Sequence, residues 1–185
     1  MKRRKPHFLL LTSFVLLALS VLSTEEPQPS EYQLKAVFLY NFAKFVEWPQ
    51  EAFSSPTAPF TIGVIGQNPF DKELERTVDN KTINGHPFAI KYLRTIPEAN
   101  SCQILFISAS ERKRLPDILK AASPGNTLTV GETDRFLQAG GMIRFFMDEN
   151  KVRFDINDEA AKNAGLRISS KLLGVARRVL NDGVK

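Results

Sequence analysis

The sequence from residue 102 to residue 130, CQILFISASERKRLPDILKAASPGNTLTV, alternates between two hydrophobic patterns. Residues 104–107 are an uninterrupted apolar run, which is typical of a strand that is buried on both faces. Ser110 can then cap a helix over residues 111–122, and the breakers Ser-Pro-Gly that follow end it. Residues 127–130 are rich in β-branched side chains and indicate a second strand. A strand, a helix and a strand in this order predict parallel pairing.

The same alternation continues toward the N-terminus. Residues 60–65 predict another buried strand, and Asn68-Pro69 predicts the start of a helix that runs to about Val78. Asn84-Gly85 is a turn signal, and residues 88–93 after it alternate like a strand. We therefore expect an α/β fold with a mostly parallel central sheet and helices on both faces.

The pattern changes after a short helix that we expect at residues 135–138, ending at Gly140-Gly141. Residues 142–146 and 152–156 are two alternating runs joined by the turn residues 148–150. This spacing predicts a hairpin near the C-terminal end of the domain, which would make an antiparallel edge of the sheet.

Two further helices are expected after the hairpin. Asn157 or Asp158 can cap the first, which stops at the Asn-Ala-Gly signal ending in Gly165. Ser169 can cap the second, which would bury apolar residues as far as Val179.

The first helix of the domain, from residue 31 to Trp48, contains the aromatic stretch LKAVFLYNFAKFVEWP (34–49). One broad arc can face the sheet, and we expect the stem of Lys35 to lie along its rings while the ammonium reaches water. Val37, Tyr40 and Trp48 lie away from this arc. Either they pack under neighbouring loops, or this face meets another protein. The arc consists of Leu34, Phe38, Leu39, Phe42, Phe45 and Val46.

The N-terminal residues read as a secretory signal rather than as part of the fold. Residues 2–5 are basic, and the uncharged run 8–22 is shorter than the roughly 20 residues that a membrane anchor needs. We expect cleavage near Ser23, a linker over residues 24–30 and a single domain over residues 31–185. Four of the 25 basic residues leave with the signal, so 21 face 20 acidic ones. A mature charge near +1 removes the main argument for nucleic-acid binding.

The chain offers little chemistry for catalysis. His86 is the only histidine after cleavage, no nucleophile motif is present, and acidic residues do not cluster as metal ligands do. Cys102 is the only cysteine, so it can form no internal disulfide. We expect it to be a buried small residue, with an intermolecular bridge or a reactive thiol as the alternative. We expect no enzyme activity, no cofactor and no metal. The turn from Gly63 to Phe70 matches no phosphate-binding motif, but a periplasmic small-ligand sensor using this turn remains the alternative function.

Several stretches, taken in order, resemble the YfiR family of periplasmic regulators. The resemblance implies an α/β domain, commonly dimeric, that binds the periplasmic portion of an inner-membrane diguanylate cyclase and holds it inactive. Lower cyclic di-GMP and less biofilm would follow. Some relatives carry additional cysteines, whereas this chain has only Cys102. The stretches are residues 34–49, 102–108, 140–143, 152–157, 160–161, 165–166 and 169–173.

For the contact with the partner we predict a set of polar positions in the C-terminal region, although a solvated helix face is the competing interpretation of each residue. Release would be a population shift, in which a signal stabilises the free form more than the bound one. The predicted positions are Glu159, Lys162, Asn163, Arg167 and Lys171.

Overall fold

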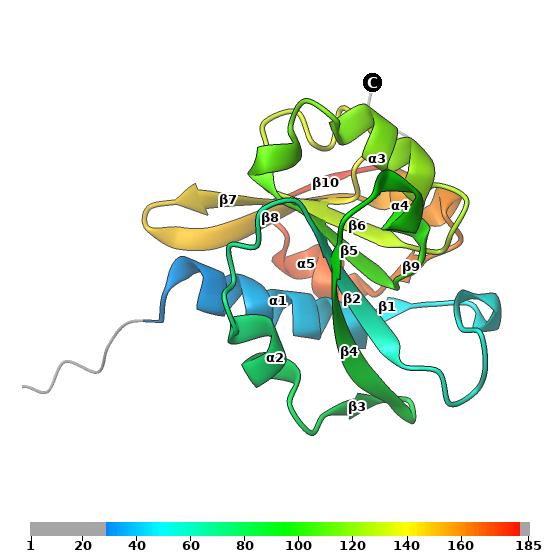
Figure 1. Ribbon diagram of the computed structural model, residues 1–185. Helices are drawn as coiled ribbons and strands as arrows, with labels where there is room; N and C mark the ends of the chain where they lie inside the picture. Colours follow the sequence, from blue (N-terminus) through cyan, green and yellow to red (C-terminus); the bar gives the residue numbers. More distant parts are fainter. Residues whose placement is uncertain (1–28, 182–185) are drawn as a thin grey trace, which may run out of the picture.

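In a computed structural model, which describes residues 29–181, the chain forms a twisted sheet with helices on both faces (Figure 1). This confirms the predicted fold class. The helices are α1 (Glu31–Phe45), α2 (Glu73–Val78), α3 (Leu115–Ala122), α4 (Asp158–Asn163) and α5 (Ser170–Val175), with 3-10 turns η1 (Gln50–Ala52), η2 (Ile96–Asn100) and η3 (Ala109–Glu111). The strands are β1 (Val46–Glu47), β2 (Phe60–Ile65), β3 (Thr82–Ile83), β4 (His86–Leu93), β5 (Ile104–Ile107), β6 (Leu128–Gly131), β7 (Ile143–Asp148), β8 (Lys151–Asn157), β9 (Arg167–Ile168) and β10 (Arg178–Leu180).

The main sheet has eight strands in the order β10-β8-β7-β6-β5-β2-β4-β3. The five strands from β4 through β2, β5 and β6 to β7 pair with one another in parallel, as predicted, whereas the short strand β3 is antiparallel to β4. The hairpin β7–β8 is antiparallel, and its two turn residues, Glu149 and Asn150, both have positive φ, the turn geometry that suits the twist of paired strands.

The prediction that this hairpin forms the edge of the sheet is wrong. Strand β10 pairs in parallel with the outer side of β8, with Val179 opposite Ile156. The predicted last helix ends at Val175, because Ala176 is already extended and lets the chain return to the sheet. The predicted caps are correct: Asn157 accepts from the Ala160 N–H in α4, and Ser169 accepts from the Leu172 N–H in α5.

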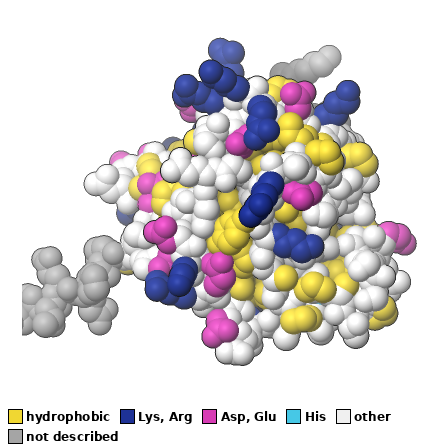
Figure 2. Space-filling view, in the orientation of Figure 1, with side chains coloured by type: hydrophobic (Ala, Val, Ile, Leu, Met, Phe, Trp, Pro, Cys, Tyr) yellow, Lys and Arg dark blue, Asp and Glu magenta, His cyan; other side chains and the backbone are white. Residues whose placement is uncertain are grey.

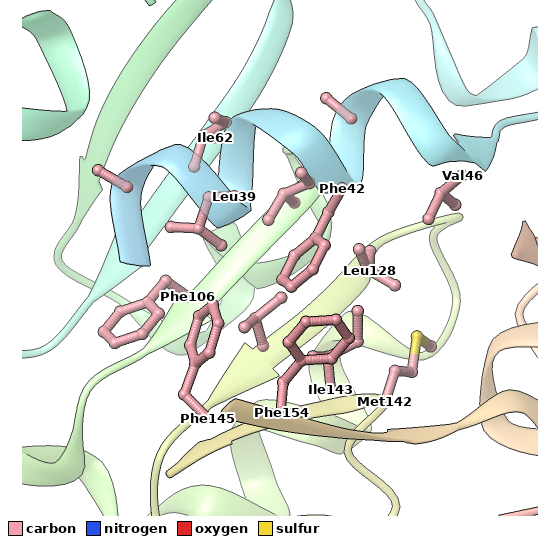
Figure 3. Packing of buried hydrophobic residues seen from close by; sticks show 14 of the residues in the cluster. Leu39, Phe42, Val46, Ile62, Phe106, Leu128, Met142, Ile143, Phe145 and Phe154 are labelled. Carbon is pink, nitrogen blue, oxygen red and sulfur yellow. The ribbon is translucent and has the colours of Figure 1, made fainter. Parts of the chain in front are cut away.

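The larger hydrophobic core lies between the sheet and helices α1, α2 and α5. Figure 3 shows the ring of Phe42, from α1, pointing down onto the rings of Phe145 and Phe154 from the hairpin. The ring centroids of Phe42 and Phe154 are 5.3 Å apart at an edge-on angle, which suits their quadrupoles. A second core on the opposite face of the sheet contains α3 and η2 side chains.

The segment between β6 and β7 is a series of turns, so the helix predicted at residues 135–138 is wrong. Arg135 has a φ of 63°, which interrupts any helix. Phe136 is fully buried, and its ring lies between the Cα atoms of Gly131 and Gly141. A Cβ atom on either glycine would overlap the ring. The glycines are therefore needed for close packing.

Two other helices begin later than predicted. Helix α2 starts at Glu73 instead of Pro69, since Asn68 accepts from the Phe70 N–H in a local turn and Asp71 has a positive φ. Helix α3 starts at Leu115, because the residues after Ser108 form the separate turn η3.

Helix α1 ends at Phe45 rather than at Trp48, and residues 46–47 become strand β1. Val46 pairs with Ile168, and Glu47 pairs with Arg167 of β9, in a two-stranded antiparallel ribbon. The ribbon places the C-terminal region beside the end of α1. The predicted signal peptide and most of the predicted linker lie outside the described residues. Within residues 29–181, none of the helices combines the length and the apolar character that crossing a bilayer requires.

Candidate partner-binding surface

Helix α1 has two apolar faces, which accounts for its many aromatic side chains. One face is buried against the sheet and includes Leu39 and Phe42. The other is a stripe of residues three or four positions apart, which covers the β7–β8 hairpin and reaches α5. Val37 in this stripe is 45% exposed. The stripe consists of Leu34, Val37, Phe38 and Phe45, with the polar Asn41 among them; Leu34, Phe38 and Phe45 also pack at the edge of the larger core.

A small hollow opens between this stripe and α5, which we call the α1/α5 hollow. Its volume is 240 Å³, and its polar lining residues are Asn41 and Lys171. Val175 forms part of its rim and is 67% exposed. Because small-molecule sites usually measure about 300–1,000 Å³, the hollow is better suited to an apolar side chain of another protein. Its apolar lining consists of Phe38, Phe42, Phe45, Phe154, Leu172 and Val175.

Three of the five predicted partner residues lie on α4. Glu159 is half-buried, and Lys162 is exposed, with its ammonium 2.6 Å from the Asp158 carboxylate. Asn163 is exposed and lines a different hollow of 400 Å³, between α3 and α4. The three residues thus have different surroundings on α4.

The other two predicted residues lie closer to α1. The Arg167 guanidinium is 3.6 Å from the Glu47 carboxylate, and both side chains are mostly in solvent. Lys171 lines the α1/α5 hollow. Among the described residues, no hydrogen bond or ion pair joins any two of the five predicted positions. The sequence did not identify Phe38, Phe45 and Val175 as residues of a partner site. The excess of apolar residues around α1 was the signal that could have indicated a second apolar surface.

Tyr40 and Trp48 pack locally, whereas Val37 does not. The Tyr40 ring lies 5.6 Å from the Phe88 ring. The Trp48 ring meets Phe60 edge-on at 4.9 Å, and its Nε1–H donates to the backbone oxygen of Gln103 at 3.2 Å. Of the three residues predicted to lie outside the main arc, Val37 is the one left exposed.

The expectation that the Lys35 ammonium reaches water is wrong. Lys35 is 2% exposed, and its Nζ lies 2.5 Å from the Glu31 carboxylate and 2.6 Å from that of Glu132. Burial alone would lower the pKa of Lys35, but hydrogen bonds to Glu132 and Glu31 outweigh it, so the pKa is raised. The ion pair fixes the first turn of α1 against the end of β6.

The turn from Gly63 to Phe70 is filled by the protein itself. Gly66 has a φ of 94° and lies against Ser110 and Glu111. The Gln67 N–H donates to the Ser110 hydroxyl at 2.9 Å, and the Phe70 N–H donates to the Asn68 side chain. Backbone amides that are already bonded leave little for an anion to bind. This geometry favours a plain tight turn.

Cys102 is buried, as predicted, and lies beside Gly63. Burial raises the pKa of its thiol to about 12. A buried thiol that stays protonated is a poor nucleophile. Within residues 29–181, no group of three or more His, Cys, Asp or Glu side chains is arranged to hold a metal ion.

Charged side chains are mixed on the face drawn in Figure 2. Lysine and arginine side chains lie among acidic ones, and no continuous basic stripe crosses this face. A nucleic-acid footprint would need such a stripe.

Comparison with known proteins gives the family. A family model described as YfiR/HmsC-like matches residues 32–177. The chain belongs to the YfiR/HmsC-like family. The resemblance noted in the sequence is therefore confirmed over nearly the whole described domain. None of the curated proteins matches the chain.

Two solved structures match the chain to different degrees. A conserved domain protein from Vibrio cholerae has a TM-score of 0.56 and 13% identity, over 81% of this chain and 60% of that one. The second is the ABC domain in complex with L-Trp from Streptococcus pneumonia, with a TM-score of 0.49 and 12% identity, over 70% of this chain and 57% of that one. The YfiR/HmsC-like chain thus spans less than two thirds of either protein. The first similarity supports the fold alone, and the second carries no inference.

Proposed function

We propose that this YfiR/HmsC-like protein is an exported periplasmic regulator without catalytic activity. It binds the periplasmic portion of an inner-membrane signalling protein, a diguanylate cyclase, and holds it inactive. Family membership supports the regulatory role. The signal-like N-terminal sequence supports export.

One observation carries the binding role: the exposed Val175 forms the rim of an apolar hollow, and a second exposed valine, Val37, lies on the α1 stripe that borders it. Val37 and Val175 are 45% and 67% exposed, and the α1/α5 hollow lies between the helices that carry them. Exposed apolar residues that gather around a hollow are typical of an interaction site. Lys171 at its edge, and Arg167 on the neighbouring ribbon, supply the polar rim that protein interfaces usually have.

The regulator works by occupancy. While the hollow holds an apolar side chain of the cyclase, the cyclase stays inactive and cyclic di-GMP, and with it biofilm, stays low. A releasing signal must favour the free form over the bound form, because equal affinity for both would shift nothing. The regulator also acts as a homodimer, as the family resemblance implies.

The experiment is the substitution Val175→Asp, with Tyr92→Asn as the matched control. Both side chains are large and exposed, but Tyr92 lies on β4, toward the opposite end of the sheet, where its hydroxyl donates to Glu75. We expect Val175→Asp to reduce retention on cyclase-containing membranes about tenfold or more and to raise cyclic di-GMP, because a carboxylate would be desolvated at an apolar contact. Tyr92→Asn should change neither.

Sedimentation of both variants distinguishes a contact with the cyclase from a contact between two copies of the chain. Full retention and repression by Val175→Asp would overturn the proposed surface. Conversion of a dimer into monomers by Val175→Asp would assign the hollow to the contact between copies of the chain, which also overturns its assignment to the cyclase.

A further inference from the structure

A larger hollow, which we call the aromatic hollow, lies between the end of α1, the segment after it and the β3–β4 hairpin. Its volume is 760 Å³. This is within the usual range of about 300–1,000 Å³ for small-molecule sites. It is separate from the turn at Gly63 to Phe70 that the sequence suggested.

Flat rings line the aromatic hollow. Tyr40, Trp48, Phe53 and Phe60 contribute to its wall, together with the imidazole of His86. The Phe53 and His86 rings are stacked, with centroids 4.0 Å apart and planes inclined by 12°. His86 Nδ1 lies 2.6 Å from the backbone oxygen of Ala58 and must donate to it, because a carbonyl oxygen can only accept. The rings are thus held in place before any ligand arrives.

The lining of the aromatic hollow carries one positive and one negative side chain, and among the described residues only the negative one is already paired. Lys44 is the positive one, is exposed and forms no ion pair with any residue from 29 to 181. Glu47 is the acidic residue of the lining, and Arg167 already faces it at 3.6 Å. An anionic group would therefore be attracted to this rim.

We propose that the aromatic hollow binds a small planar aromatic anion. The ring of the ligand packs against the aromatic wall, where stacked and edge-on contacts are favourable, and its carboxylate pairs with Lys44. Size, ring geometry and rim charge all point to this class of ligand.

The position of the hollow also gives it a regulatory role, a step that rests on the proposed function. Val46 and Glu47 of β1 line the hollow, and they pair with Ile168 and Arg167 of β9. A ligand adds contacts to one strand of a ribbon whose other strand lies next to the proposed partner surface. A release signal requires that such a ligand bind the free form of the regulator more tightly than the cyclase-bound form.

The chain contains a single tryptophan, so nitrogen-15 NMR gives one indole N–H signal, from Trp48 in the wall. We use 1-naphthoate as the probe, with 1-naphthylmethylamine as the cationic control and cyclohexanecarboxylate as the non-aromatic control. We expect a saturable shift of the indole signal with naphthoate, and at least fivefold weaker binding of both controls.

Two lysine substitutions test the role of charge. Lys44→Gln should weaken naphthoate binding about fivefold, whereas Lys120→Gln, on α3 at the opposite face of the sheet, should not. The proposed site is wrong if naphthoate gives no saturable shift, if naphthylmethylamine binds equally well, or if Lys44→Gln leaves the affinity unchanged. Retention on cyclase membranes is then measured with and without naphthoate. Unchanged retention would show that the regulatory step is wrong. This measurement is made on the parent protein, so its outcome is separate from that of the Val175→Asp experiment.

Discussion

The ammonium of Lys35 lies 2.6 Å from the carboxylate of Glu132, although 97 positions separate them in the sequence. The contact joins the first turn of helix α1 to the residue that follows strand β6. Tyr32 adds to it, since its ring centre is 4.5 Å from the same ammonium and its hydroxyl donates to Glu132. A buried charge in this setting depends on its partners.

Breaking this ion pair should destabilise the fold strongly. Lys35→Met leaves the Glu132 carboxylate, which is 12% exposed, without its main partner. We expect a loss of roughly 3 kcal/mol in the free energy of unfolding, measured by urea titration. Lys44→Met, at an exposed position of the same helix, should change stability by less than about 0.5 kcal/mol. A loss below about 1 kcal/mol for Lys35→Met would contradict this prediction.

Alkaline pH should weaken the same contact. The pKa of Lys35 is raised in the folded protein by its carboxylate partners against the opposing effect of burial, and the pKa of Tyr32 is raised by burial and by Glu132. Both groups have a pKa of about 10 in the unfolded protein and a higher one in the folded protein. Such a group stabilises the fold at pH values below its unfolded pKa, and this stabilisation is lost as the pH rises through its folded pKa. Urea midpoints should fall from about pH 9 to about pH 11, less steeply in Lys35→Met. Parallel curves for the two proteins would rule out the mechanism.

A methyl group at Gly141 should disrupt the packing around Phe136. The ring is fully buried and cannot move away from an added Cβ. We expect Gly141→Ala to cost roughly 1–3 kcal/mol by thermal unfolding. Gly174→Ala is the matched control, because nothing lies near its Cβ position in α5, and it should stabilise by about 0.5–1 kcal/mol. If Gly141→Ala is as stable as the parent, the ring does not occupy this site.

Cys102 should be unreactive in the folded protein. Burial raises the pKa of its thiol to about 12, so very little thiolate forms near neutral pH. Ellman's reagent should therefore release no colour from the native protein and one equivalent per chain in urea. Rapid reaction of the native thiol would show that the segment before β5 opens readily.

Charge reversal tests the residues that the sequence suggested for the partner contact. We expect Glu159→Lys combined with Arg167→Glu to raise cyclic di-GMP without lowering the melting temperature, because charges at an interface rim govern association more than folding. Lys113→Glu, on the segment before α3, is the control and should leave output unchanged. Unchanged output from the double variant would place both residues outside the interface.

Much of the fold followed from local patterns in the sequence. The hairpin β7–β8 and the caps Asn157 and Ser169 depend on residues within a few positions of each other, so a sequence reading can find them. Strands β1, β9 and β10 have two or three residues each and are too short to show any period. Their pairing is decided by tertiary contacts.

The sites were harder to predict than the fold. The burial of Lys35 depends on Glu132, and the α1/α5 hollow needs α1, β8 and α5 together. Among the predicted partner residues, Lys171 lies at that hollow because α5 packs beside α1, whereas Asn163 faces another one. Side-chain type alone could not distinguish these environments.

The pairing of Val46 with Ile168 has a consequence for how the chain reaches its folded state. Most of the domain's sequence lies between β1 and β9, the two strands of the ribbon. The end of α1 can therefore pair with β9 only after the C-terminal region has been made. Such distant contacts slow folding. The ribbon can close only once residue 168 of 185 has been made, so the chain lacks this closure during most of its synthesis, which suits the export proposed above.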